Sequence, residues 1–289
     1  MEEMKNIMVI VPHEDDEILM TAGIIEKAVS EGRKVTVVMA GNGDYEGWDK
    51  ESGSVRLGET LEGLQVLGMG LDEVIFMGYA DTGMDPIESF LYRLYTEQEE
   101  DAVHAGHCSS ETYGRADKPD YHTARHGQAA AYTRKNFKED LRDILRERKP
   151  DTVFTTGLDD LHGDHRGLFL FVKEVLQEEY PNGDGPVLFS TVVHSTAGDE
   201  SWPLREPLRT FTCPEGFDEG SLKWKERISF PVPDSMLHSD YSKNKKVLAL
   251  EKHRSALKED AVDFLYSFIK SEELFWRIEY GIETANISN

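Results

Sequence analysis

Short runs of apolar, largely β-branched residues alternate with amphipathic helical patterns along most of the chain. The runs that predict strands are residues 6–11, 34–41, 73–78, 151–157 and 187–193. Helical patterns occupy residues 18–30, 55–67, 136–148 and 167–179. Because the strand runs are continuously apolar, both faces of the sheet should be covered. The alternation therefore predicts an α/β fold: a Rossmann-like, mostly parallel sheet with helices on both faces.

Three stretches depart from this alternation. Residues 82–133 form a long polar region, which we expect to be an insertion or lid beside the sheet. Residues 197–240 are rich in Pro, Gly and Trp, and residues 242–280 are expected to be mostly helical and to close the fold. At 289 residues, the chain is expected to form a single domain (1–289) with insertions and a helical C-terminus.

Composition narrows the range of partners. The net charge is −23, from 32 basic and 55 acidic residues, which argues against binding to nucleic acid or to an anionic membrane. The two cysteines, Cys108 and Cys213, predict neither a disulfide framework nor a cysteine-based zinc site. The first residues do not resemble a signal peptide, and no apolar stretch is as long as a membrane span. We therefore expect a cytoplasmic protein; its oligomeric state is left open.

Polar clusters follow four of the predicted strands. They are His13, residues 41–44, residues 80–81 and residues 159–165. In a parallel sheet these clusters lie at one edge, where ligands of such folds bind.

Two of the clusters contain the side chains that zinc prefers. His13 and Asp16, three residues apart across a strand-to-helix turn, and His165 from the later cluster would form a site of two histidines and one carboxylate. Taken singly, Asp15 or Asp16 is more simply explained as a helix N-cap, and each histidine as a loop residue. The occurrence of two such clusters at matching strand ends favours a metal site.

The remaining polar residues of these clusters suggest hydrolytic chemistry. Asp15 is placed to take a proton from water activated by the metal. His162 is placed to stabilise charge on an attacked carbonyl oxygen or to protonate a leaving group. Asp164 could orient His162 or a ligand histidine. This set of residues suits hydrolysis of an amide or an ester.

The same residues resemble a known family. HEDDE at positions 13–17 is similar to the HPDDE motif of the PIG-L/LmbE-like de-N-acetylases, and HGDH at positions 162–165 is similar to their HxDH motif. The resemblance implies a Rossmann-like fold and zinc-dependent removal of acyl groups from N-acetylglucosamine-type substrates. It also implies His13, Asp16 and His165 as metal ligands and Asp15 as general base. His162, with Asp164 as its partner, would stabilise the oxyanion and assist the leaving amine.

Weaker similarities and two departures accompany these motifs. The resemblance implies that Arg56 contacts the sugar and that Asp81, in DTGM at 81–84, holds sugar hydroxyls. GNGD at 41–44 and KVLALEKHRS at 246–255 are weaker matches. Glu14 replaces the usual proline and is expected to face solvent, whereas Glu17 is expected near the helix start or behind the metal ligands. Ala256 replaces the usual glutamine.

A group of histidines lies outside the motifs. His104, His107, Cys108, His122 and His126 crowd the long polar region. Their spacing fits no strong metal-binding template, so polar lid contacts are the favoured interpretation and a second metal site the alternative.

The sequence thus predicts a hydrolase that uses Zn²⁺, or Fe²⁺ or another divalent ion, to remove an acyl group from a small acylated amino sugar or conjugate. The acyl group expected is acetyl. The alternatives are a metal-dependent esterase or amidase acting on a non-sugar substrate, and a sugar-binding protein without catalysis. Asp15 and Asp16 are predicted not to be interchangeable: Asp16 should hold metal and Asp15 should handle the proton.

Overall fold

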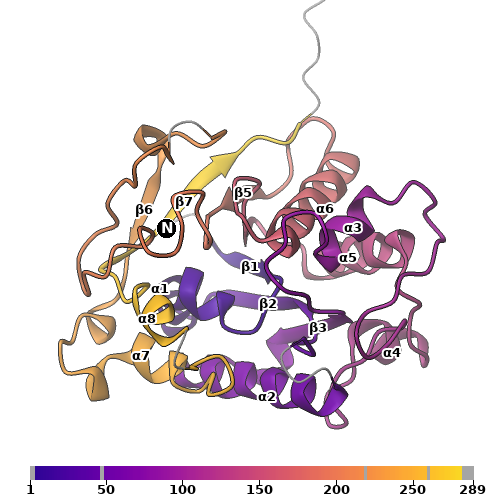
Figure 1. The fold of residues 1–289 in the computed structure, drawn as a ribbon, viewed down its shortest axis with the longest axis horizontal. Coiled ribbons are helices and arrows are strands. Elements are labelled where there is room, and N and C mark those ends of the chain that lie inside the picture. Colours follow the sequence, from indigo (N-terminus) through magenta and orange to yellow (C-terminus); the bar gives the residue numbers. More distant parts are fainter. Residues whose placement is uncertain (1–3, 46–48, 218–219, 259–260, 282–289) are drawn as a thin grey trace, which may run out of the picture.

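The computed structural model describes residues 4–45, 49–217, 220–258 and 261–281. Seven strands form one sheet in the order β3-β2-β1-β4-β5-β7-β6 (Figure 1). The strands are β1 (Asn6–Val11), β2 (Lys34–Gly41), β3 (Val74–Tyr79), β4 (Thr152–Thr155), β5 (Val187–Ser190), β6 (Ile228–Pro231) and β7 (Glu272–Ile278). Strands β1 to β5 are parallel, and β7 pairs antiparallel with both β5 and β6.

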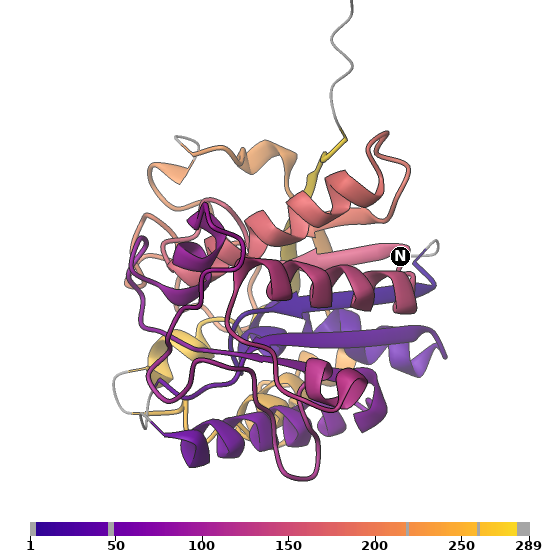
Figure 2. The ribbon, with the colours of Figure 1, turned by 90° about the vertical axis from the view of Figure 1, so that its right-hand side faces the viewer.

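Helices cover both faces of this sheet. They are α1 (Asp16–Ser30), α2 (Lys50–Val66), α3 (Phe90–Thr96), α4 (Tyr121–His126), α5 (Arg134–Arg148), α6 (Gly163–Glu179), α7 (Lys245–Leu250) and α8 (Val262–Tyr266). Short 3-10 turns occur at Leu71–Glu73, Trp224–Glu226, Asp234–Met236 and Tyr241–Lys243. Figure 1 shows α3, α5 and α6 on one side of the sheet and α1, α7 and α8 on the other, and in Figure 2 the first group faces the viewer.

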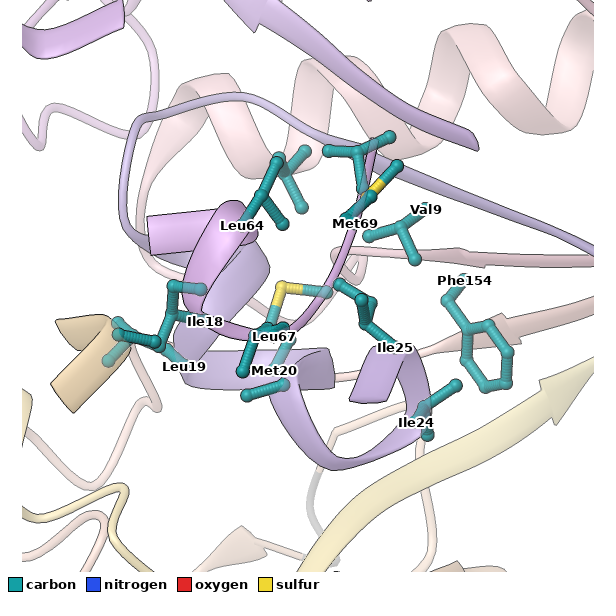
Figure 3. Packing of buried hydrophobic residues seen from close by; sticks show 14 of the residues in the cluster. Val9, Ile18, Leu19, Met20, Ile24, Ile25, Leu64, Leu67, Met69 and Phe154 are labelled. Carbon is teal, nitrogen blue, oxygen red and sulfur yellow. The ribbon is translucent and has the colours of Figure 1, made fainter. Parts of the chain in front are cut away.

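Strand β1 shows why both faces are covered. Ile7, Val9 and Val11 point into a core formed with α1, α2 and α7, part of which is drawn in Figure 3. Met8 and Ile10 point into a second core formed with α3, α5 and α6. Alternate residues of the strand therefore contribute to different cores, as expected for a continuously apolar strand in a parallel sheet.

The strand order places two loops next to each other. From β1 the chain builds outward through β2 and β3, then returns to add β4 on the other side of β1. Since β1 and β4 are parallel neighbours, the segments that follow them leave the sheet at the same edge. This reversal of strand order is where ligands bind in doubly wound sheets.

The predicted fold class is confirmed, and most predicted elements lie within a few residues of the observed ones. One expectation was wrong. Residues 242–280 hold two short helices, α7 and α8, and then strand β7. Its sequence, EELFWRI, is rich in aromatic and branched residues, and Phe275 and Trp276 are buried in the sheet, where such side chains pack best.

The long polar region contains two short helices. Helix α3 packs against α6, with Phe90, Leu91 and Leu94 buried. Helix α4 packs against β3. Nowhere in the described parts of the chain is a helix both long enough and apolar enough to span a bilayer.

Candidate metal centre and active site

The predicted site residues converge at the carboxyl edge of β1 and β4. His13 and Asp15 lie in the turn from β1 to α1, and His162 ends the loop from β4 to α6. Together with residues of the 81–84 segment they border an open cavity of about 430 Å³. The lining residues from these elements are His13, Asp15, Asp16, Arg56, Asp81, Thr82, Gly83, Met84, His162 and His165. The cavity lies in the size range of small-molecule sites.

Three of these side chains present donor atoms in a compact triangle. The Nδ1 atom of His13 lies 3.2 Å from Nε2 of His165 and 3.5 Å from Oδ2 of Asp16, and the last two atoms are 3.3 Å apart. Ligands about 2.05 Å from a tetrahedral zinc ion are ~3.3 Å from one another. The triangle therefore has the dimensions of one face of such a tetrahedron.

Other carboxylates contact the far nitrogens of His13 and His165. Nε2 of His13 lies 3.2 Å from Asp81 Oδ1 and 3.3 Å from Asp164 Oδ2. Nδ1 of His165 lies 3.1 Å from Asp160 Oδ2. Each imidazole thus turns one nitrogen to a carboxylate and the other to the centre of the triangle, as ligand histidines do around metals.

The electrostatics of the group also favour a cation. Burial would lower the pKa of His13, but Asp81, Asp16 and Asp164 together raise it well above its usual value. Burial likewise opposes ionisation of Asp16, yet His165 and His13 lower its pKa to about 2. A proton on His13 occupies the position of positive charge that a divalent ion would take. The donor set, the spacing and the charge all fit a divalent metal.

Asp15 is held in a conformation that few residues other than glycine adopt. Its φ is 113° and its ψ is −30°. Although it occupies the N-cap position of α1, its side chain makes no capping hydrogen bond and lines the cavity instead. Burial, followed by the neighbouring Asp16 carboxylate, raises the pKa of Asp15 to about 7. The N-cap explanation does not apply, and the carboxylate is suited to accept a proton near neutral pH.

A buried pair fixes the backbone of this turn. Oε2 of Glu17 accepts a hydrogen bond from the Asp15 N–H at 3.0 Å. Oε1 of Glu17 lies 3.1 Å from Nε2 of His253, without hydrogen-bond alignment. Burial opposes protonation of His253, but Glu17 outweighs it and raises the pKa. Glu17 therefore lies behind the site, and His253, from the weakly matching C-terminal segment, supports it.

His162 serves both as helix cap and as part of the cavity wall. Its Nδ1 accepts a hydrogen bond from the Asp164 N–H at 3.2 Å. With Nδ1 as acceptor, the neutral ring carries its proton on Nε2. Burial and the imidazoles of His13, His165 and His194 lower the pKa of His162 well below its usual value. The ring is thus a neutral hydrogen-bond donor.

The Asp164 carboxylate does not contact His162. Its oxygens accept hydrogen bonds from the Thr82 hydroxyl at 2.7 Å and from the Leu91 N–H at 2.7 Å. Its Oδ2 also lies 3.3 Å from His13. Of the two positions that the sequence left open for Asp164, beside His162 or beside a predicted ligand histidine, the structure shows the second, with its carboxylate next to His13.

Arg56 and Asp81 lie together at the rim of the cavity. Nη1 of Arg56 is 3.0 Å from Asp81 Oδ2, and Nη2 donates to the Glu14 carbonyl at 3.1 Å. The expectation that Glu14 faces solvent was wrong: its side chain is fully buried, with Oε2 3.5 Å from Arg56. Burial raises the pKa of Glu14 to about 7, although Arg56 opposes the rise. Gly43, with φ 69°, makes room for this carboxylate, because a Cβ there would lie 2.6 Å from Glu14 Oε2.

Two functional candidates were not singled out from the sequence. Asp160 holds the ring of His165, and its Oδ1 accepts from the His162 N–H at 3.0 Å. His194 lines the cavity after β5, contacts Asp199 and stacks on Phe264. Asp160 lies in the 159–165 cluster that the strand-end rule located, although no role was assigned to it, and the same rule applied after the fifth predicted strand would have found His194.

Comparisons with known proteins identify the family and structures of similar fold. The family model described as PIG-L, GlcNAc-PI de-N-acetylase, matches residues 8–176. No protein with a curated function matches the sequence. Among solved structures, the N,N'-diacetylchitobiose deacetylase from Pyrococcus horikoshii, complexed with its inhibitor MPG, is 16% identical. Its TM-score is 0.56, and the match covers 96% of this chain and 85% of that one.

Two further structures come from deacetylases of antibiotics. The A40926 pseudoaglycone deacetylase Dbv21 is 17% identical, with a TM-score of 0.57, over 97% of this chain and 100% of that one. The zinc-inhibited form of the teicoplanin deacetylase Orf2 is 15% identical, with a TM-score of 0.54, over 94% and 97%. At these identities the likeness is one of fold.

Proposed function

The chain belongs to the PIG-L family of de-N-acetylases, and on this premise we propose that it hydrolyses the N-acetyl amide of an amino sugar or amino-sugar conjugate with a divalent metal ion. One observation carries the proposal. The metal-binding atoms of His13, Asp16 and His165 are 3.2 to 3.5 Å apart. Beside them lie Asp15, whose side chain makes no capping hydrogen bond, and a neutral His162. These are the parts that amide hydrolysis needs, and they border a single cavity.

In this proposal His13, Asp16 and His165 hold the ion. Zn²⁺ is the favoured ion, and Fe²⁺ or another divalent ion suits the same donors. When bound, the ion supplies Lewis acidity and lowers the pKa of water. Asp81, Asp164 and Asp160 keep the two ligand rings in orientation.

Asp15 and His162 have separate tasks. Asp15 accepts a proton from the attacking water, whose oxygen forms the new bond to the acyl carbon. His162 donates a hydrogen bond from Nε2 to the carbonyl oxygen as negative charge develops there. The C–N bond then breaks, and the amine leaves with the proton that Asp15 took. Since His162 is neutral with a lowered pKa, it is a poor source of this proton, which favours Asp15.

Substrate recognition falls to the cavity rim. We propose that Arg56 and Asp81 bind hydroxyl groups of an N-acetylglucosamine-type sugar, as in the family resemblance, while also buttressing the metal site. Residues 82–84 begin the long polar region and line the cavity, so this region shapes the choice of substrate. Deacetylases of N,N'-diacetylchitobiose and of the A40926 pseudoaglycone share this fold, which is consistent with an amino-sugar conjugate as substrate.

The test is a pair of variants assayed on a substrate panel. Metal content and release of acetate are measured with N-acetylglucosamine derivatives, simple N-acetyl amines and acetate esters. We expect Asp16→Asn to lose bound metal, and Asp15→Asn to keep metal but lose turnover by a factor of at least ~10². Equal metal loss in both variants would remove the division of roles. Preference for the esters would favour the esterase alternative, and a lack of turnover on the whole panel would favour a binding protein.

A further inference from the structure

A second group of imidazoles and carboxylates lies away from the active site, between α4 and α5. His122 and His126 are four residues apart on α4, and their ring centroids are 4.4 Å apart. Nδ1 of His122 lies 2.8 Å from Oδ1 of Asp140 on α5. One donor atom from each of these three residues lies within 4.8 Å of the other two.

The spacing on α4 is one that brings two imidazoles to a single ion. Side chains at i and i+4 lie on the same face of a helix, one turn apart, which is how two histidines of a helix bind zinc. Helix α4 holds this face in place, because the Asp120 side chain caps its N-terminus and Gly127 ends it in the left-handed conformation. The face turns toward Asp140.

Asp140 is not satisfied by this contact. Its side chain is 3% exposed, and Oδ2 has no well-aligned hydrogen-bond partner among the residues that the structure describes. Burial raises the pKa of the nearby Tyr79 hydroxyl, and the Asp140 carboxylate raises it further through its charge and a weak hydrogen-bond interaction, although the geometry is not that of a regular hydrogen bond. A buried carboxylate oxygen without a partner is unfavourable unless something else compensates it.

The surroundings of Asp140 are short of positive charge. Burial raises the pKa of Asp140 to about 6; His122 opposes this rise, and Asp120 and Asp143 add to it. Arg125 on α4 pairs with Asp143 and Glu147 and not with Asp140. A simple His122–Asp140 hydrogen bond accounts for one imidazole and one oxygen, and leaves His126 and the second oxygen without a role.

We propose that His122, His126 and Asp140 bind a divalent transition-metal ion, with water in the remaining positions. Two imidazoles and one carboxylate suit Zn²⁺, Co²⁺ or Ni²⁺ better than Mg²⁺ or Ca²⁺, which prefer oxygen ligands alone. His122 and Asp140 are mostly buried and His126 is exposed, so the ion has access from solvent. Such an ion fastens α4 to α5, and with it the end of the long polar region to the body of the protein.

This site plays no part in the proposed catalysis, so the test measures how many metal ions each protein molecule binds. Metal-stripped protein is titrated with Co²⁺ or Zn²⁺ at pH 7.5, and bound metal is measured after equilibrium dialysis. His126→Ala removes an exposed ligand, and Asp140→Asn removes the buried charge with little change in shape. His238→Ala, at another exposed histidine, is the matched control.

Wild-type protein and His238→Ala are expected to bind one equivalent more than His126→Ala, or to bind that equivalent at least tenfold more tightly. Asp140→Asn should resemble His126→Ala. The difference of one equivalent is expected whether or not the active centre takes up metal, which separates this inference from the proposed function. Equal stoichiometry and affinity in wild type and His126→Ala would overturn it, as would equal loss in His238→Ala.

Thermal unfolding provides a second readout. An ion that binds the folded state alone raises its stability by mass action, by about 2.7 kcal/mol at a hundredfold excess over Kd. Added metal should therefore raise the Tm of wild-type protein more than that of His126→Ala. Identical shifts in the two proteins would contradict a clamp between α4 and α5.

Discussion

The turn between β1 and α1 and the loop between β4 and α6 lie side by side at the sheet edge, and each brings to the cavity one side chain with a proposed role in catalysis. In the first, Asp15 sits at the N-cap position but does not cap, and its φ is 113°. In the second, His162 has ordinary extended dihedrals and caps α6 through Nδ1. The backbone conformation that turns Asp15 into the cavity is strained and lowers the stability of the fold. At His162, the hydrogen bond from the Asp164 N–H to Nδ1 both caps α6 and leaves the ring proton on Nε2.

The two segments also differ in their support. In the β4–α6 loop, Asp160 accepts from the His162 N–H and contacts His165, and its carboxylate also accepts from the Val193 and His194 N–H groups of the neighbouring segment after β5. The β1–α1 turn depends on a residue far away in the sequence. The Glu17 carboxylate holds the Asp15 N–H, and His253, 236 residues after Glu17, contacts that carboxylate. A strained turn needs outside support to persist, and these contacts supply it.

The largest effect is therefore expected from His253→Ala. Removing one member of a buried ion pair leaves Glu17 without its partner and should lower the free energy of unfolding by about 3–5 kcal/mol. Because Glu17 also holds the Asp15 N–H, kcat should fall while KM stays near the wild-type value. Denaturant unfolding and steady-state kinetics measure the two effects.

His253→Gln is the matched variant, since it retains a donor toward Glu17. It should recover most of the stability and most of kcat. If His253→Ala lost stability alone, with kcat unchanged in the folded fraction, His253 would have no role in positioning Asp15.

The next prediction separates the two roles of His162. His162→Ala removes the cap and the imidazole, so it should lower stability by about 1 kcal/mol and the rate by about 10²–10³. His162→Asn keeps a capping oxygen, so it should retain stability and show the same loss of rate. Deacetylation and urea unfolding of both variants are the measurements. Equal stability of the two variants would show that the cap contributes nothing.

These expectations depend on features that the sequence indicated to different degrees. Strands β1 and β2 were predicted with their observed bounds, because continuous apolar runs end abruptly at Pro12 and Asn42. The starts of α2 and α6 were placed several residues late, since their first turns are polar and carry no apolar periodicity. Local pattern locates buried segments well and capped polar ends poorly.

The site shows the same limit. HEDDE and HGDH located the residues that converge, because strand order alone brings their loops together. The burial of Glu14 depends on the distant Arg56, and the support of Asp15 depends on His253. Nothing local distinguishes a buried acid with a remote partner from a solvated one, so these contacts could be found only in three dimensions.

The metal-free protein should also reveal the difference between the segments through pH. Asp15 and Glu14 have pKa values raised to about 7, so their ionisation opposes folding as pH rises from about 4 to 7. The raised pKa values of His13, His194 and His253 act in the same direction, since stability is lost as each deprotonates. His162, in the other segment, acts in the opposite direction below its usual pKa.

We therefore expect the chelated protein to lose stability between pH 5 and pH 8, most steeply below pH 7, where both carboxyl groups still hold protons in the folded state and have lost them in the unfolded chain. Urea unfolding across this range measures it. Asp15→Asn should make the profile less steep, because one of the two carboxyl groups of this turn that titrate near pH 7 is gone and Glu14 remains. A profile that rises toward pH 8 would contradict the assignment of strain and unfavourable charge to this turn.

The smallest effect expected is a gain in stability on removing the functional side chain. Glycine adopts φ 113° without a Cβ clash, so Asp15→Gly should relieve the backbone strain and stabilise the protein by about 1 kcal/mol, after allowing for the greater freedom of glycine when unfolded. Turnover should be lost with the carboxylate. Lys149→Gly is the control, because Lys149 also has a positive φ, of 48°, at the exposed end of α5, and it belongs to neither motif. The Lys149→Gly variant should gain similar stability with no change in kcat. If Asp15→Gly were instead less stable than wild type, the turn would not be strained and the contrast with His162 would fail.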